Sequence, residues 1–183
     1  MKRFAIAFAA ALAAGCASSP QPRFYTLSAE LPQAAAAQGP SVSVSATVPD
    51  KFDRPQFVVV VNANEVAILE QHRWAEPLAG EIARVIAEDL SRTTGNPRIA
   101  GSPQGAIRNA ERRVTVDVLR LDGRLEGEVV VDALWSVRGE KGALLRGGRS
   151  TVRETAGKTY DTLVAAYSRA LAKVSGDIAT ALR

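Results

Sequence analysis

Apolar residues at helical spacing mark a first segment near the middle of the chain. From Leu78 to Leu90 they fall on one face of a 3.6-residue period. Pro77 suits a first helical turn, because its missing N–H would have no partner there. Gly95 can end the helix in a left-handed conformation. The pattern predicts a helix that opens around residues 74–77 and ends at about residue 94.

A second helical stripe occupies the end of the chain. Its apolar positions recur every three or four residues from Tyr160 to Leu182. Thr159 stands just before the stripe and is the expected N-cap. The spacing predicts a long C-terminal helix over about 159–182.

Alternating or β-branched apolar residues mark the remaining ordered segments, a pattern typical of half-buried strands. Strands are predicted at 23–29, 41–48, 56–61, 65–69, 113–121, 128–138 and 144–154. Asn62–Asn64 separates two of them by a short turn, which indicates a hairpin. The segments 30–40 and 101–105 are expected to be loops.

The order of these elements indicates the fold class. A group of strands precedes the first helix, and a three-stranded meander precedes the second. We expect an α+β fold, an antiparallel β-sheet with two main helices packed on one face. Its length suits a single domain over residues 23–183.

The first fifteen residues have the pattern of a signal peptide. Lys2 and Arg3 precede the uncharged apolar stretch 4–14, which is too short to span a bilayer. Small residues then lead to Gly15 and Cys16. This resembles the bacterial lipobox and predicts signal cleavage between Gly15 and Cys16, with covalent diacylglyceryl and acyl groups, palmitate among them, on the Cys16 sulfur and amine.

Cys16 is the only cysteine of the chain, so no internal disulfide can form. The alternatives to lipidation are cleavage by the ordinary signal peptidase nearby, or an unused or intermolecular thiol. Residues 16–22 are small, polar and contain prolines, which is typical of a tether. In lipoprotein sorting, Ala17 in place of aspartate after the cysteine implies the outer membrane of a Gram-negative cell.

Composition narrows the class of protein. Of 183 residues, 46% are hydrophobic and 23% charged, which is typical of a globular domain. The net charge of +4 includes Lys2 and Arg3, which leave with the signal peptide. The other basic residues are scattered, whereas nucleic-acid binding requires a clustered basic face. We expect no nucleic-acid partner.

Catalytic motifs are absent from the sequence. His72 is the only histidine, so no His/Cys metal site can form, and we expect no metal and no catalytic residue. There is no nucleophile elbow, phosphate loop or dinucleotide fingerprint. Asp50 and Asp53 are better explained by turns than by a carboxylate pair, and Glu88-Asp89 is interpreted as solvated helix surface. These observations predict a protein that is not an enzyme.

The two tryptophans allow two interpretations. Trp135 shares its strand face with four apolar residues, which favours core packing. Trp74 precedes the first helix and either packs there or anchors an interface, since aromatic residues are enriched at binding hot spots. With Arg73 beside it, Trp74 is the candidate for a partner interface.

Several short segments, taken in their order and spacing, carry a resemblance to a known family. They are the lipobox ending at Cys16, Phe24-Tyr25-Thr26-Leu27, Val48-Pro49 with Arg54-Pro55-Gln56, Trp74-Ala75-Glu76-Pro77-Leu78, and Asp122-Gly123 with the strand through Trp135. Over nearly the whole mature chain the sequence resembles the ABC-type transport auxiliary lipoproteins, the group similar to paraquat-inducible protein C (PqiC), which is associated with membrane integrity.

The resemblance implies a function as well as a fold. It implies an outer-membrane lipoprotein on the periplasmic face, in an envelope lipid transport system of the mammalian-cell-entry (MCE) or ABC type. Such a subunit would dock the periplasm-spanning component at the outer membrane. The implied partners are an MCE-domain protein anchored in the inner membrane, membrane lipids, and copies of the chain itself in a homo-oligomeric ring.

Two alternatives remain open from the sequence. The domain could itself carry a lipid in an apolar pocket between sheet and helices. It could also support envelope integrity without any part in transport. Cys16 is the only functional residue that the resemblance transfers, and no cofactor is expected beyond its covalent lipid.

Overall fold

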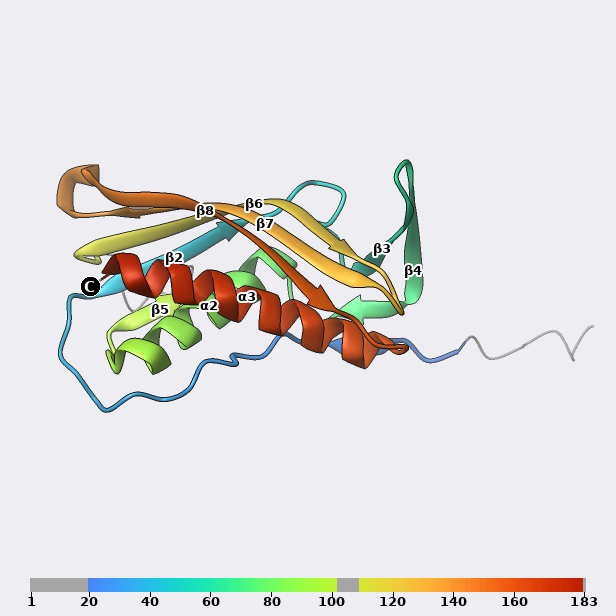
Figure 1. Cartoon of the computed structure of the whole chain (residues 1–183), viewed down its shortest axis with the longest axis horizontal. Coiled ribbons are helices and arrows are strands. Elements are labelled where there is room, and N and C mark those ends of the chain that lie inside the picture. Colours follow the sequence, from blue (N-terminus) through green and yellow to red (C-terminus); the bar gives the residue numbers. More distant parts are fainter. Residues whose placement is uncertain (1–19, 102–108, 183) are drawn as a thin grey trace, which may run out of the picture.

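The computed structural model describes residues 20–101 and 109–182, and Figure 1 shows their arrangement. The elements in chain order are β1 (Arg23–Tyr25), β2 (Val42–Thr47), β3 (Gln56–Asn62), β4 (Glu65–Trp74), α2 (Leu78–Thr94), β5 (Ile99–Gly101), β6 (Arg112–Gly123), β7 (Glu128–Arg138), the short 3-10 turn η2 (Glu140–Gly142), β8 (Leu144–Thr155) and α3 (Tyr160–Leu182). The predicted α+β class is confirmed.

A five-stranded sheet forms the larger layer, in the order β5-β2-β6-β7-β8. Helices α2 and α3 lie side by side against one of its faces (Figure 1). The meander β6-β7-β8 is antiparallel, as expected, but β2 runs parallel to both β5 and β6. The purely antiparallel sheet was therefore a wrong expectation. Parallel neighbours need a crossover connection, and the segment containing α2 supplies it between β2 and β6.

A separate three-stranded sheet has the order β1-β4-β3. The predicted hairpin is confirmed as β3 and β4, and β1 pairs in parallel with the last three residues of β4. β4 continues to Trp74, five residues beyond the predicted strand, whereas β1 ends at Tyr25, four residues short of its predicted end. The hairpin rises from one end of the molecule (Figure 1).

One continuous core joins both sheets and both helices. The predicted stripes of α2 and α3 supply its helical side, and inward-facing valines such as Val114, Val129 and Val131 supply the sheet side. Trp135 is partly buried against this core, and its indole N–H donates to the Ser150 hydroxyl at 3.0 Å. An added Cβ at Gly148 would lie 2.5 Å from the indole, so Gly148 leaves the space that the ring occupies.

The ends of the helices agree with the predicted caps. Gly95 follows α2 with φ +70°, and the Thr159 hydroxyl accepts the Thr162 N–H at 3.3 Å at the start of α3. The loop after the first strand also packs at Gly95, where the Ala37 N–H donates to the Gly95 carbonyl at 2.9 Å. Gly95 thus ends the helix and receives a neighbouring segment.

Replacing Gly95 with alanine should destabilise the domain by more than about 2 kcal/mol. A left-handed conformation alone costs a residue with a Cβ roughly 1–2 kcal/mol, and the new Cβ would lie 1.9 Å from the Ala35 carbonyl oxygen. Gly176→Ala is the control, because no atom lies within 4 Å of its Cβ position in α3. It should stabilise the domain by about 0.5–1 kcal/mol. Urea denaturation measures both, and equal effects would contradict the assigned cap.

Candidate functional site

The predicted lipid-bearing residue, Cys16, and its neighbour Gly15 lie outside the described residues. The described chain begins at Pro20 and enters the domain at β1. The part of the domain that receives the predicted tether is therefore the part where an anchor would act. It consists of β1 and the segment Thr26–Leu31 that follows, here called the strap.

The first half of the strap is held by a buried carboxylate of α2. Glu81 has only 2% of its surface exposed. Its carboxylate accepts the Leu27 N–H and the Thr26 hydroxyl, each at 2.9 Å. Arg84 donates to the same carboxylate at 2.9 Å and to the Leu27 carbonyl at 2.8 Å. Hydrogen-bond donors from the strap and from α2 therefore replace the water that would otherwise hydrate the Glu81 carboxylate.

The second half of the strap is held in the same way, about two turns further along α2. Asp89 is fully buried, and its Oδ1 accepts the N–H groups of both Glu30 and Leu31 at 2.8 Å. Arg92 of α2 donates to the Ala29 carbonyl at 3.1 Å. The strap has no β-ladder of its own, so these side chains supply the partners that its backbone requires.

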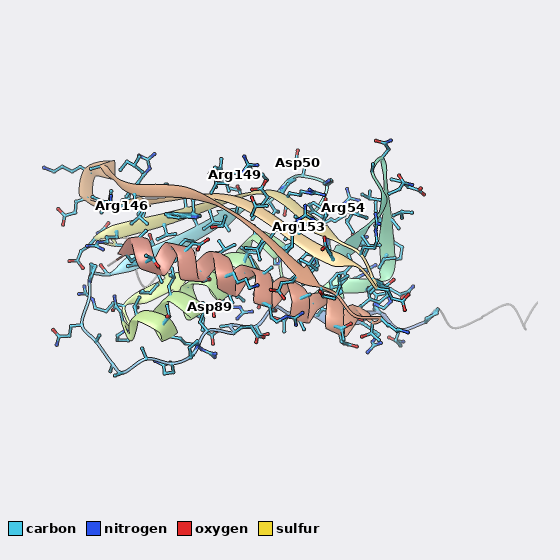
Figure 2. The ribbon with its side chains drawn as sticks, viewed as in Figure 1. Asp50, Arg54, Asp89, Arg146, Arg149 and Arg153 are labelled. Atoms are coloured by element: carbon cyan, nitrogen blue, oxygen red, sulfur yellow. The ribbon has the colours of Figure 1, made fainter. Side chains whose placement is uncertain are left out.

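Helix α3 also helps to hold the strap. The side chains that bind the strap, here called the clamp, are Glu81, Arg84, Asp89 and Arg92 of α2 and Ser168 of α3. The buried hydroxyl of Ser168 accepts the Ser28 N–H at 3.1 Å. The strap passes along the helices on the side away from the five-stranded sheet, and Figure 2 labels Asp89 where it passes. The chain that leads from the predicted anchor is therefore hydrogen-bonded to both helices.

The interpretation of Glu88-Asp89 as solvated surface was wrong for Asp89. Burial raises the pKa of its carboxyl above the ordinary value of 3.8, although the N–H groups of Leu31 and Glu30 oppose this shift. Glu88 does face solvent in part and pairs with Arg92 at 2.6 Å. The two neighbours thus have different environments on the same helix.

An aromatic cluster holds β1 from the other side. The Phe57 ring lies 4.8 Å from Tyr25 and 4.2 Å from Trp74, measured between ring centroids. Trp74 is 6% exposed and also packs edge-on against Tyr167 of α3 at 6.2 Å. Trp74 therefore has the packing role that the sequence allowed. Arg73 turns outward with its side chain 37% exposed and pairs with Glu70 at 3.6 Å.

The single histidine belongs to this cluster. His72 Nδ1 is 2.8 Å from the Tyr25 hydroxyl, and its ring lies 3.9 Å from that of Tyr160. Burial and, to a lesser extent, the positive charge of Arg23 lower the pKa of His72. Through these contacts, His72 of β4 joins β1 to α3. Within residues 20–101 and 109–182 no three metal-binding side chains gather.

Beside Trp74 lies an open hollow of about 350 Å³. Its lining comes from two loops, residues 53–55 and 74–77. The Trp74 N–H donates to the Pro55 carbonyl at 2.7 Å and joins the two loops at this point. Figure 2 labels Arg54, just ahead of β3. The two loops that line the hollow are distant in sequence, and each contains part of one of the short segments that carry the family resemblance.

Comparison with known families agrees with this arrangement. The family model described as "ABC-type transport auxiliary lipoprotein component" matches residues 25–179, from the first strand to the last turns of α3. The chain belongs to this family. No described helix of this auxiliary lipoprotein is long and apolar enough to cross a membrane.

Individual relatives support the same grouping. The intermembrane transport lipoprotein PqiC of Escherichia coli (strain K12) is 27% identical over 143 residues, which covers 74% of this chain and 73% of that protein. A crystal structure from Xanthomonas campestris superposes with a TM-score of 0.69 at 13% identity, covering 86% of this chain and 92% of that one. Another crystal structure, of an uncharacterised protein, also gives 0.69 at 20% identity, covering 90% of this chain and all of that one. The two structures support the fold.

The clamp residues of the auxiliary lipoprotein were missed from sequence, although a signal exists. Asp89 stands four residues after Val85 and three after Ile86, so it lies on the apolar face of α2. Ser168 likewise stands four residues after Val164 on the apolar face of α3. A polar residue within an apolar helical stripe indicates a buried hydrogen bond, but not which segment supplies the partner.

Replacing Asp89 tests the clamp. Asp89→Ala should destabilise the domain by about 2–4 kcal/mol, because two partly buried N–H groups lose their acceptor. Asp89→Asn keeps an acceptor oxygen of the same shape, so its cost at pH 7 should be within about 1 kcal/mol. Thermal and urea unfolding measure both variants. Equal losses in the two variants would contradict the acceptor role.

The pH dependence of stability gives an independent check. The pKa of Asp89 is raised in the folded state, so between the ordinary value of 3.8 and the raised value the folded protein binds more protons than the unfolded one. The free energy of unfolding should therefore fall as pH rises through that window. Asp89→Asn should remove this part of the slope. A wild-type minus variant difference that stays constant with pH would contradict the buried carboxylate.

Proposed function

We propose that this auxiliary lipoprotein is the outer-membrane subunit of an MCE-type envelope lipid transport system. It docks the periplasm-spanning component at the periplasmic face of the outer membrane of a Gram-negative bacterium, and it acts without catalysis. Family membership and the similarity to an intermembrane transport lipoprotein support a role in transport. The partner is an MCE-domain protein anchored in the inner membrane.

The anchor in this proposal is Cys16, with diacylglyceryl and acyl groups attached after cleavage behind Gly15. One acyl chain binds a membrane only marginally, whereas several make the anchoring stable. Seven residue steps separate Cys16 from Arg23, where β1 begins. At full extension they span at most about 25 Å. The anchored domain therefore stays close to the membrane surface.

The strap is the observation that carries the docking role. A subunit that joins a membrane to a large partner needs a fixed connection between its membrane anchor and the domain that binds the partner. The strap fixes the chain to both helices through Glu81, Asp89 and Ser168 within a few residues of β1. The described chain is thereby held to the helices directly after β1.

A conduit with this subunit at its far end has a clear physical purpose. Lipid tails that cross the aqueous periplasm would expose apolar surface to water, and a protein path avoids that cost. Copies of the subunit arranged in a homo-oligomeric ring would surround the end of such a path.

The carrier alternative receives less support from the interior of the domain. A lipid held between sheet and helices needs a cavity there, but the space lined by Phe57, Leu121 and Leu163 measures about 10 Å³. That volume holds at most about one water molecule. Two larger hollows, of about 350 and 280 Å³, open to the surface.

The proposal predicts that Cys16→Ser abolishes function without affecting the fold. Residue 16 precedes the core, so the variant should unfold at the wild-type temperature. It should nevertheless leave the membrane fraction, fail to retain an MCE-domain protein during purification in mild detergent, and leave cells as permeable as a deletion strain. Mass analysis of the wild-type N-terminus is the control for lipidation. Full complementation by Cys16→Ser would contradict the proposal.

A further inference from the structure

One end of the domain carries large apolar side chains that the core does not cover. Val61, Val66 and Ile68 of the hairpin are 46%, 41% and 45% exposed, and Phe24 of β1 is 62% exposed. The hairpin strands are apolar at successive positions, over 57–61 and 66–69, so both faces of the hairpin are apolar. Large apolar side chains exposed together on one projecting hairpin indicate an interaction surface.

These residues lie beside the point where the chain enters the domain. In the three-stranded sheet, Phe24 is paired with Arg73 near the end of β4. Seven residue steps along β4 lead from His72 back to Glu65 at the hairpin turn, a path of at most about 23 Å. Figure 1 shows the blue N-terminal segment leaving at the same end as the hairpin.

The length of the tether limits how far this end can be from a membrane. The seven steps from Cys16 to Arg23 span at most about 25 Å, which is close to the path length from β1 to the hairpin turn. An acylated Cys16 therefore keeps Phe24 and the hairpin within reach of the bilayer surface. Of the other exposed large apolar side chains, Leu119 and Leu134 lie in β6 and β7, and Leu144 and Leu145 follow the β7–β8 turn at the opposite end (Figure 1).

The polar groups of the hairpin suit the headgroup region of a bilayer. At the turn, the Asn62 side-chain amide donates to the Glu65 carboxylate at 2.8 Å, and the Asn64 N–H donates to Asn62 Oδ1 at 3.0 Å. β3 is an edge strand, so the backbone groups on its open side need water or headgroups. Hydrocarbon could not satisfy these groups, which favours contact at the interface over deep insertion.

We infer that the β3–β4 hairpin and Phe24 rest on the lipid headgroup surface of the membrane that holds the anchor. The inference rests on the anchoring of Cys16 in the proposed function and adds the orientation of the domain. Val61, Val66, Ile68 and Phe24 enter the interfacial layer. The β7–β8 turn and the end of α3 then face the periplasm, where a partner would arrive.

The chain offers a clean way to test this orientation. In the lipidated protein the Cys16 sulfur is in a thioether, so one introduced cysteine is the only free thiol. Ile68→Cys and Leu145→Cys are matched sites, 45% and 47% exposed in the wild type, at opposite ends of the domain. Each lipidated variant carries an environment-sensitive fluorophore and is reconstituted in phosphatidylethanolamine/phosphatidylglycerol vesicles, with and without a headgroup nitroxide lipid.

The expected result is quenching at position 68 that is at least about threefold stronger than at position 145. Equal quenching at both positions in protein that sediments with the vesicles would overturn the orientation and leave the anchor intact. A shielded but unquenched label at position 68, with disulfide-linked dimers of Val66→Cys, would also overturn it, because a second copy would then cover the hairpin. A free Cys16 thiol in the wild type, with no sedimentation, would instead overturn the anchor and the proposed function.

Discussion

Two buried carboxylates of one helix, Glu81 and Asp89, connect the N-terminal end of the domain to its core. A buried carboxylate is tolerated only when donors replace its water, and backbone N–H groups of the strap provide them. The strap in turn has no β-ladder and depends on these acceptors. Without α2 the strap loses these acceptors, and without the strap Asp89 Oδ1 loses its two donors, whereas Asp89 Oδ2 has no hydrogen-bond partner among the described residues. The position of any anchor on the tether relative to the helices depends on this exchange.

The regular elements could be predicted because their signals are local. The stripes of α2 and α3, the left-handed Gly95 and the meander β6-β7-β8 follow from spacing and turn residues alone. The direction of β2 could not, because alternation shows which side chains are buried but not which strand lies beside them. β5 is only three residues long and is ordered by its parallel pairing with β2. The split into two sheets likewise depends on contacts distant in sequence.

The candidate site likewise contains parts that could be predicted from local sequence signals and parts that could not. The pattern resembling a lipobox and the segments around Arg54 and Trp74 were visible in the sequence, and the fold brings the latter two together at one hollow. The clamp was not predicted, because its donors lie more than fifty residues from Glu81 and Asp89 along the chain. Trp74 packs in the core, and Arg73 is partly exposed and paired with Glu70. In the proposed orientation, α3 joins a membrane-facing end to a periplasm-facing end, which is the arrangement that the proposed docking role requires.

Amide hydrogen exchange of the strap tests the central claim most directly. If the buried carboxylates hold the strap, the amides of Leu27, Glu30 and Leu31 exchange only through global unfolding, at rates similar to those of the buried turns of α2. The amide of Gln33, an exposed residue just beyond the strap, provides the internal reference for a loop. Exchange of the three strap amides as fast as that of Gln33 would contradict the account, because the connection between tether and core would then open without unfolding the domain.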